Sequence, residues 1–287
     1  MTCPADLHTH TTASDGQYTP SQLAAKALAA GIQILAVTDH DTMDGAEEAV
    51  RAGQACGLTV LRGVELGARE DRHMHILGLN LGPECPALAE LRASREERKY
   101  RIAAFLRGKG LDVPLEEVEA LAGGGVVARP HFARVMLRRG YVSSLREAFD
   151  RYLDTDEYQR IERWKAGAPE CIAAIHDAGG KAVLAHPCQL GCSHGRLEEI
   201  LRALKDAGLD GIECFYPRHS PEQTAAYLRL ADKYGLHITG GSDFHGEAVR
   251  PDTFLTPIPL NLNWLGTFQN AQPHRNKLDQ SQIPHFR

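Results

Sequence analysis

Histidine and carboxylate residues recur at the ends of short apolar runs along this sequence. His8 and His10 are two residues apart at the end of the first run, so both side chains would point to one face of a strand. A lone histidine is more often an ordinary hydrogen-bonded residue than a ligand, but a whole series of them in one pattern is hard to obtain by chance. The set comprises His8, His10, Asp15, His40, Glu65, His75, His186, Asp243 and His245.

These side chains predict a cluster of divalent metal ions. Six imidazoles and three carboxylates are too many for a single tetrahedral or octahedral ion, and they suit two or three ions. Three ions would bring about +6 and the carboxylates about −3, which leaves about +3 to attract an anionic substrate. A polynuclear centre of this kind is suited to the hydrolysis of phosphate esters.

The elements that must position these residues alternate between short apolar strands and helices. Thr19, Pro20 and Gln22 have the pattern of a helix start with a capping box, and Ser220-Pro221-Glu222-Gln223 repeats it. A further helix is expected over Thr42–Cys56. The alternation predicts an α/β fold with a parallel sheet, and ligands at successive strand ends favour a closed or nearly closed barrel. The predicted strands end at or cover Asp6–His10, Ile32–Val37, Leu58–Val64, His73–Leu79, Ala182–Ala185, Leu209–Cys214 and Leu236–Thr239.

Residues 99–165 interrupt the alternation. They are rich in Arg and Glu, and their pattern is mainly helical. We therefore predict a first barrel part over residues 1–98, a helical insertion or cap over 99–165, and a second barrel part with a C-terminal tail over 166–287. Gly123-Gly124-Gly125 in the cap predicts a hinge or turn, because no Lys-Ser/Thr follows it as in a phosphate-binding loop.

The composition excludes several classes of protein. A chain of 287 residues with 43% hydrophobic and 24% charged residues is globular. It has no apolar stretch long enough for a membrane span and no basic, apolar leader, so we expect neither membrane insertion nor secretion. Seven cysteines, an odd number, indicate reduced thiols and a cytoplasmic location. The net charge of −5 argues against a protein that binds duplex DNA.

Six short motifs together resemble the PHP (polymerase and histidinol phosphatase) family. The resemblance implies a distorted seven-stranded (β/α) barrel with a metal cluster at its carboxyl end. Arg129-Pro130-His131 and Tyr216-Pro217-Arg218-His219-Ser220 are similar to the branch that removes the 3′-phosphate from nucleoside 3′,5′-bisphosphates, some members of which trim short RNA from the 5′ end. The six motifs are His8-Thr9-His10, Asp15-Gly16, Thr38-Asp39-His40-Asp41, Gly63-Val64-Glu65, Leu184-Ala185-His186-Pro187 and Gly241-Ser242-Asp243-Phe244-His245.

The resemblance implies three metal sites. One would contain His8, His10, Glu65 and Asp243, and Glu65 would bridge to a second ion that His75 and His186 complete. His75 is preferred to His73 because it lies deeper in its apolar run. The third site would consist of Asp15, His40 and His245. Many family members have histidine where this chain has Asp15, and the hard oxygen ligand favours Mn²⁺, with iron or zinc as alternatives. The nucleophile would be a hydroxide that bridges two ions.

Basic residues of the cap are expected to select the substrate. Arg129, His131 and Arg134 stand at the start of a predicted helix, where they could bind the 5′-phosphate, and Lys165 could join them. The alternative for this group is an ordinary solvated basic face. Arg218 and His219 follow a barrel strand and are expected at the substrate site, with His219 as a candidate acid for the leaving group.

Two other functions remain open at this point. The first is a phosphatase for another small monoester such as histidinol phosphate, although a single phosphate needs no second anion site. The second is a non-catalytic barrel that binds metal. The expected partner is a small anionic nucleotide, with short RNA as an addition, and the sequence leaves the oligomeric state open. Glu213 either supports the metal ligands from behind or is simply a hydrogen-bonded acid.

Overall fold

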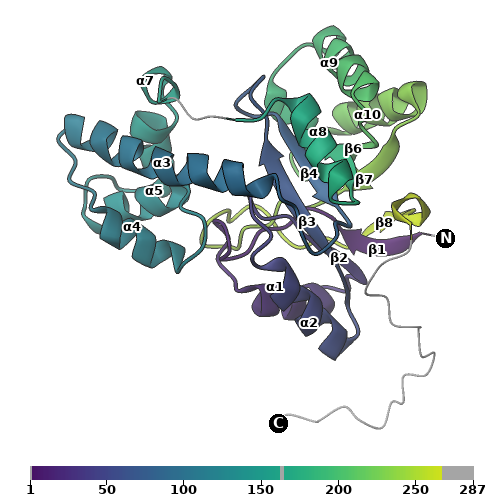
Figure 1. Ribbon diagram of the computed structural model, residues 1–287, viewed down its shortest axis with the longest axis horizontal. Coiled ribbons are helices and arrows are strands. Elements are labelled where there is room, and N and C mark those ends of the chain that lie inside the picture. The colour runs from purple at the N-terminus through teal and green to yellow at the C-terminus, as the bar shows by residue number, and fades with distance from the viewer. Residues whose placement is uncertain (1, 162–164, 267–287) are drawn as a thin grey trace.

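One eight-stranded sheet forms the centre of the protein (Figure 1). The computed structural model describes residues 2–161 and 165–266. The strand order is β7-β6-β5-β4-β3-β2-β1-β8. The strands are β1 (Cys3–Asp6), β2 (Ile34–Val37), β3 (Thr59–Gly67), β4 (His75–Leu79), β5 (Lys181–Leu184), β6 (Gly211–Phe215), β7 (His237–Gly240) and β8 (Ile258–Leu260).

The sheet is mixed, so the expected parallel arrangement is wrong for two strands. β4 runs antiparallel to both β3 and β5, and β8 runs antiparallel to β1. The connection between β3 and β4, residues 68–74, is too short for the crossover helix that a parallel pair needs, so the two strands form a hairpin. β8 adds one strand to the seven that were expected.

The sheet curls so that the carboxyl ends of β1 and β7, which lie on opposite sides of the strand order, approach each other. The segment after β1 runs beside the segment after β7, where the Leu7 amide donates to Gly240 O at 3.1 Å and the Asp243 amide donates to His8 O at 2.8 Å. The His10 amide continues the contact by donating to Phe244 O at 2.9 Å. The sheet is therefore a nearly closed barrel, as expected.

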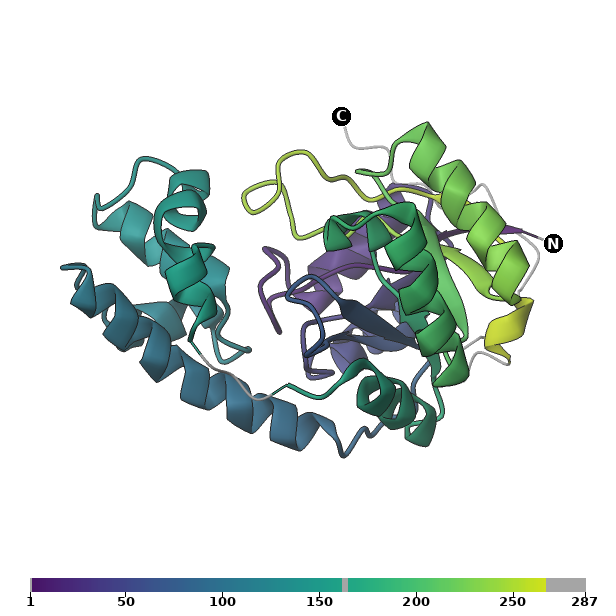
Figure 2. The same ribbon diagram turned by 90° about the horizontal axis from the view of Figure 1, so that it is seen from above.

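Helices cover the outside of this barrel (Figures 1 and 2). The N-caps Thr19 and Ser220 both form the predicted capping boxes. One helix, α2, begins four residues later than expected, because the Thr42 hydroxyl accepts a hydrogen bond from the Asp44 amide in a turn before the helix. The covering helices are α1 (Pro20–Ala29), α2 (Ala46–Cys56), α8 (Ala168–Asp177), α9 (His194–Asp206) and α10 (Pro221–Tyr234).

The expected helical insertion forms a separate body beside the barrel (Figure 2). Its own apolar core includes Leu106, Phe132, Met136 and Tyr158. The helix α3 crosses the expected boundary between residues 98 and 99, because its helical pattern begins ten residues before that boundary. The cap contains α3 (Leu88–Gly108), α4 (Leu115–Ala122), α5 (Arg129–Arg138), α6 (Leu145–Ala148), a π-helical turn (Phe149–Leu153) and α7 (Asp156–Gln159).

The last part of the described chain forms one short element after β8. After β8, a 3₁₀ turn covers Asn263–Leu265, and the expected tail beyond it, residues 267–287, lies outside the described residues. Within residues 2–161 and 165–266, no helix is both long and apolar enough to cross a membrane.

Candidate metal centre

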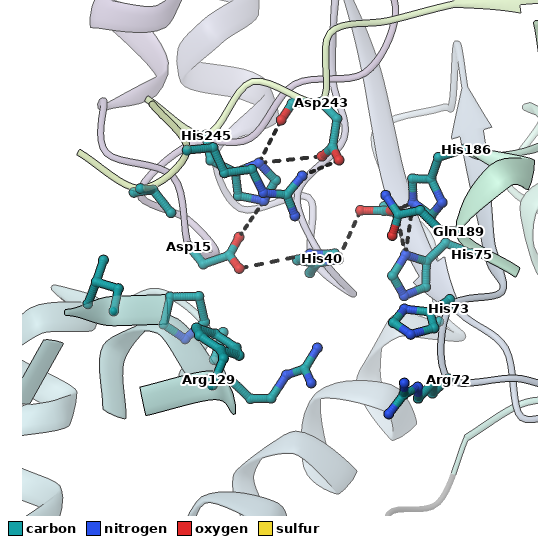
Figure 3. Close-up of a pocket in the computed structure, with 18 of the residues that line it drawn as sticks. Asp15, His40, Arg72, His73, His75, Arg129, His186, Gln189, Asp243 and His245 are labelled. Carbon is teal, nitrogen blue, oxygen red and sulfur yellow. Dashed lines mark hydrogen bonds and ion pairs between the residues drawn. The ribbon is translucent and has the colours of Figure 1, made fainter. Parts of the chain in front are cut away.

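The nine predicted ligands come together at one end of the barrel, where Figure 3 shows several of them. Most of them follow the carboxyl end of a strand. His75 is the first residue of β4 and pairs with Gly67, the last residue of β3. Because β4 is antiparallel, its start lies where the neighbouring parallel strands end. The reversal of β4 therefore keeps His75 in the cluster.

Glu65, a buried residue of β3, lies at the middle of the cluster. Its Oε1 is 2.7 Å from His75 Nδ1 and 3.0 Å from His186 Nε2, and these two nitrogens are 3.3 Å apart. Burial alone would raise the pKa of this carboxyl group, but the surrounding imidazoles hold the pKa well below its usual range. Its Oε2 faces three more imidazole nitrogens, His8 Nε2 at 3.5 Å, His10 Nε2 at 3.2 Å and His40 Nδ1 at 3.0 Å.

Asp243 and Asp15 extend the cluster away from Glu65. Asp243 Oδ1 is 3.5 Å from His8 Nε2 and 3.4 Å from His10 Nε2. Asp15 Oδ1 is 3.3 Å from His245 Nε2. Four overlapping groups have ligand atoms within 4.8 Å of one another: His10, Asp15, His40 and His245; His8, His10 and Asp243; His8, Glu65 and His186; and His40, Glu65 and His75.

These groups differ from the expected partition in three respects. His10 also lies with Asp15, His40 also lies with Glu65 and His75, and His8 also lies with His186. Two ligands, His186 and Asp243, have positive φ angles of 27° and 54°. Such backbone strain in residues other than glycine is concentrated at functional sites.

The cluster fits metal ions because many of its polar atoms have no hydrogen-bond partner within the described part of the chain. Leaving a buried polar atom unpaired costs about 1–3 kcal/mol, so a single fold rarely tolerates many together. Bound cations would satisfy these atoms, and imidazole with carboxylate donors suits Mn²⁺, iron or Zn²⁺. The unpaired atoms are His8 Nε2, His10 Nδ1 and Nε2, Glu65 Oε2, His186 Nδ1 and His245 Nε2.

Two buried carboxylates lie beside the cluster, one against the predicted ligands and one against the loop between His10 and Asp15. Glu213 Oε1 is 3.2 Å from His8 Nδ1, and its Oε2 accepts a hydrogen bond from the His186 amide at 2.7 Å. Glu213 therefore contacts two of the predicted ligands, as expected of a residue that supports them. Asp39, which the sequence motif contains but to which no role was given, accepts hydrogen bonds from the Thr11 amide at 2.7 Å and hydroxyl at 2.6 Å. Its position directly before His40 was the available signal.

A cavity of about 830 Å³ opens above the cluster, within the range of roughly 300–1,000 Å³ that is usual for small ligands. Asp15, His40, Glu65, His75, His186, Asp243 and His245 line it, and so do two of the predicted substrate residues, Arg129 and Lys165. Lys165 Nζ donates a hydrogen bond to Ala68 O at 3.2 Å, just after β3. Arg129 and Arg72 approach the single carboxylate of Asp154 at 3.3 and 3.4 Å. Four further arginines line the cavity without having been predicted: Arg69, Arg72, Arg98 and Arg250. Arg146 lines it too, although the sequence suggested an ordinary solvated position for this residue.

Four predicted substrate residues do not line this cavity in the described structure: His131, Arg134, Arg218 and His219. His131 caps the start of α5, where its Nδ1 accepts a hydrogen bond from the Ala128 amide at 3.0 Å, and burial lowers its pKa to about 4. The His219 ring is packed between Tyr216 and Tyr227, with ring centroids 5.1 and 4.7 Å away. The His219 Nδ1 is 3.0 Å from Cys214 O, so this side chain packs between two tyrosines and the backbone and does not line the cavity.

The barrel and its cluster of His, Asp and Glu side chains define a class of metal-dependent phosphoesterases. The model of the PHP domain matches residues 6–239, and the chain belongs to this family, as expected. A "5′-3′ exoribonuclease" of Haemophilus influenzae is 36% identical over 85% of this chain and 91% of its own length. A "3′,5′-nucleoside bisphosphate phosphatase" of Chromobacterium violaceum is 34% identical over 85% of this chain and 89% of its own length.

A solved structure shows the same architecture. It is described as a metal-dependent phosphoesterase from Bifidobacterium adolescentis and is 31% identical to this chain. The two structures align with a TM-score of 0.80 over 90% of this chain and 93% of the other.

Proposed function

We propose that this protein is a metal-dependent phosphoesterase that removes the 3′-phosphate of nucleoside 3′,5′-bisphosphates and leaves the 5′-monophosphate. One observation carries the proposal: a cluster of nine potential metal ligands and a set of basic side chains share one cavity of nucleotide size. We call these basic side chains the basic wall; they include Arg72, Arg98, Arg129 and Arg146. The names of the relatives from Chromobacterium violaceum and Haemophilus influenzae support a nucleotide or RNA substrate.

We propose two or three divalent ions in this centre, held by the nine residues that converge there. Bound ions would supply a water of lowered pKa and would stabilise the charge of the transferred phosphoryl group. Asp15 adds an oxygen ligand beside His40 and His245, so Mn²⁺ is the proposed metal, with iron and zinc as the alternatives. Metal analysis of the purified protein distinguishes them.

The residues of the chain itself would orient the substrate. The 5′-phosphate would bind to Arg129 and Lys165. Arg72 would take the part that the sequence suggested for His131 and Arg134, which do not line the cavity. The planar guanidinium group of arginine suits the oxygens of a phosphate. The 3′-phosphate would then lie toward the ligand cluster, which sets the position of cleavage.

Trimming of short RNA from the 5′ end is a second candidate activity. The cavity carries more basic residues than one terminal phosphate requires, with Arg98 and Arg146 in addition to those above. A single-stranded backbone would use the additional charges.

All seven cysteines are free thiols, and on this basis we place the protein in the reducing cytoplasm as part of the proposal.

A product assay tests the main activity. The Mn²⁺-loaded protein is given adenosine 3′,5′-bisphosphate, and both the nucleotide and the phosphate are measured. We expect adenosine 5′-monophosphate. Release of adenosine 3′-monophosphate, or no release while an aryl phosphate is cleaved, would exclude this activity and favour another monoester such as histidinol phosphate. Inactivity toward all esters with a full metal content would favour a non-catalytic barrel.

Arg129→Met tests the orientation of the substrate. We expect KM for the bisphosphate to rise by about tenfold to a hundredfold, since a charge-assisted hydrogen bond contributes roughly 1.5–3 kcal/mol. KM for adenosine 3′-monophosphate, which lacks the 5′-phosphate, should change little. Arg139→Met is the matched control, because Arg139 lies on the cap but pairs with Glu117 and Asp112 outside the cavity.

A further inference from the structure

Arg250 contacts the candidate metal centre directly, although it belongs to none of the sequence motifs. Its Nη1 forms an ion pair with Asp243 Oδ2, and the Tyr216 hydroxyl donates to the same oxygen at 3.1 Å. The other carboxylate oxygen, Oδ1, faces His8 and His10. Asp243 is therefore held on one side by two donors and presents its free oxygen to the imidazole cluster.

The backbone around Arg250 is fixed in place. The Arg250 amide donates to Gly246 O at 2.9 Å, and the Thr253 hydroxyl donates to Arg250 O at 3.1 Å. The same loop is attached to the barrel by the Ala248 amide, which donates to Gln17 Oε1 at 2.8 Å. These contacts hold the backbone from which the side chain projects, and the ion pair with Asp243 sets the direction of the guanidinium group.

The guanidinium group has donors that remain available to the cavity. Arginine carries five N–H donors, and within the described residues Asp243 is the one side chain that this guanidinium group pairs with. Arg250 lines the cavity, and its side chain is 29% exposed. Its position beside Asp243 separates it from Arg129 and Arg72, which Figure 3 shows on the opposite side of the cluster.

We propose that Arg250 binds the phosphoryl group that is hydrolysed, while the same guanidinium group orients Asp243. The inference rests on the proposed phosphoesterase activity. A planar fork that holds a carboxylate on one edge can offer its other edge to two oxygens of a phosphate. The positive charge would then stand where negative charge accumulates during phosphoryl transfer.

The test measures the binding of inorganic phosphate to the Mn²⁺-loaded protein by calorimetry. For Arg250→Met we expect the dissociation constant for phosphate to rise by about tenfold or more. Mn²⁺ affinity should change by less than about threefold, because the Tyr216 hydroxyl still holds Asp243 Oδ2 in place. Arg250→Lys keeps the charge without the fork and should show a smaller loss. Arg51→Met is the matched control, because Arg51 is exposed on α2, away from the cavity.

Three results would overturn the inference. Unchanged phosphate binding with tighter Mn²⁺ binding would make Arg250 only a counter-ion of Asp243. Loss of Mn²⁺ together with phosphate would mean that Arg250 acts only through Asp243. Absence of phosphate binding by the unaltered protein would also refute it. If Arg250→Met does not fold, the same comparison is made with Arg250→Lys. A protein that binds phosphate through Arg250 but leaves the bisphosphate intact would refute the proposed substrate and not this site.

Discussion

Gly125 of the cap packs directly on the loop that leads to Asp15. A methyl group at position 125 would lie 2.4 Å from Thr12 O and 2.8 Å from Ala13 O. The neighbouring Val126 amide donates to Ala13 O at 2.9 Å, so the two segments are joined by a hydrogen bond at the same place. Because the obstructing atoms belong to the backbone, Gly125→Ala must move the cap segment or the loop.

The size of the effect follows from these contacts. Overpacking of this kind costs about 1–3 kcal/mol of unfolding free energy. Asp15 lies two residues beyond Ala13, and its Oδ1 is 3.3 Å from His245 Nε2, so movement of the loop changes the geometry of that ligand group first. A displacement of about 1 Å at a catalytic site can cost on the order of a hundredfold in rate.

We expect Gly125→Ala to bind about one Mn²⁺ fewer per chain, or to bind it roughly tenfold to a hundredfold more weakly. Equilibrium dialysis followed by metal analysis measures this, and thermal unfolding gives the stability. Gly124→Ala is the matched control: Gly124 has a φ of +88° but no atom within 4 Å of the added methyl, so the variant carries backbone strain without touching the loop. Equal metal content in both variants would refute the reasoning.

Three further predictions concern the support of the site and the barrel. Glu213→Gln should weaken Mn²⁺ binding by about tenfold or more, because the carboxylate behind His8 is lost; an unchanged titration would contradict this. Removal of metal by a chelator should lower Tm, and Mn²⁺ at a hundred times its dissociation constant should restore about 2.7 kcal/mol per site, as scanning fluorimetry against added Mn²⁺ can check. Burial would raise the pKa of Asp210, but hydrogen bonds from His176, the Ala182 amide and Lys181 lower this pKa. Asp210 therefore stabilises the fold at pH values above its ordinary pKa of about 4, and it does so less as the pH falls below that value. Asp210→Asn should therefore cost about 1 kcal/mol at pH 7 and progressively less as the pH falls below about 4, and a pH-independent loss in urea titrations would argue against it.

The gathering of these His, Asp and Glu side chains at one rim was predictable because its signal is local. Each stands at a strand end or a neighbouring loop, and the strand ends of a barrel meet at one rim whatever lies between them in the chain. The capping boxes at Thr19 and Ser220 were predictable for the same reason, since their hydrogen bonds span three residues. The direction of β4 was also within reach, because residues 68–74 cannot contain a crossover helix.

The substrate residues were predicted less well, because residues that are close in sequence can have side chains that point in different directions. Arg129 and His131 lie two residues apart on one helix, so their side chains point about 200° away from each other, and Arg134, three residues beyond His131, shares the face of His131. Only Arg129 of these three reaches the cavity. Arg250 follows Asp243 by seven residues in an irregular loop, so no periodic pattern marks it.

The sequence alone determined the kinds of ligand, the strands and helices that carry them, and the family. The tertiary structure decided which ligands lie close enough to share an ion, and which arginines face them across the cavity. The grouping of His10 with Asp15 and of His40 with Glu65 depends on strand register and on the closure of the barrel between the ends of β1 and β7. The basic wall depends on how the cap docks on the barrel, through contacts such as Val126 with Ala13. These arrangements join residues far apart in the chain, and local patterns carry no information about the distances between them.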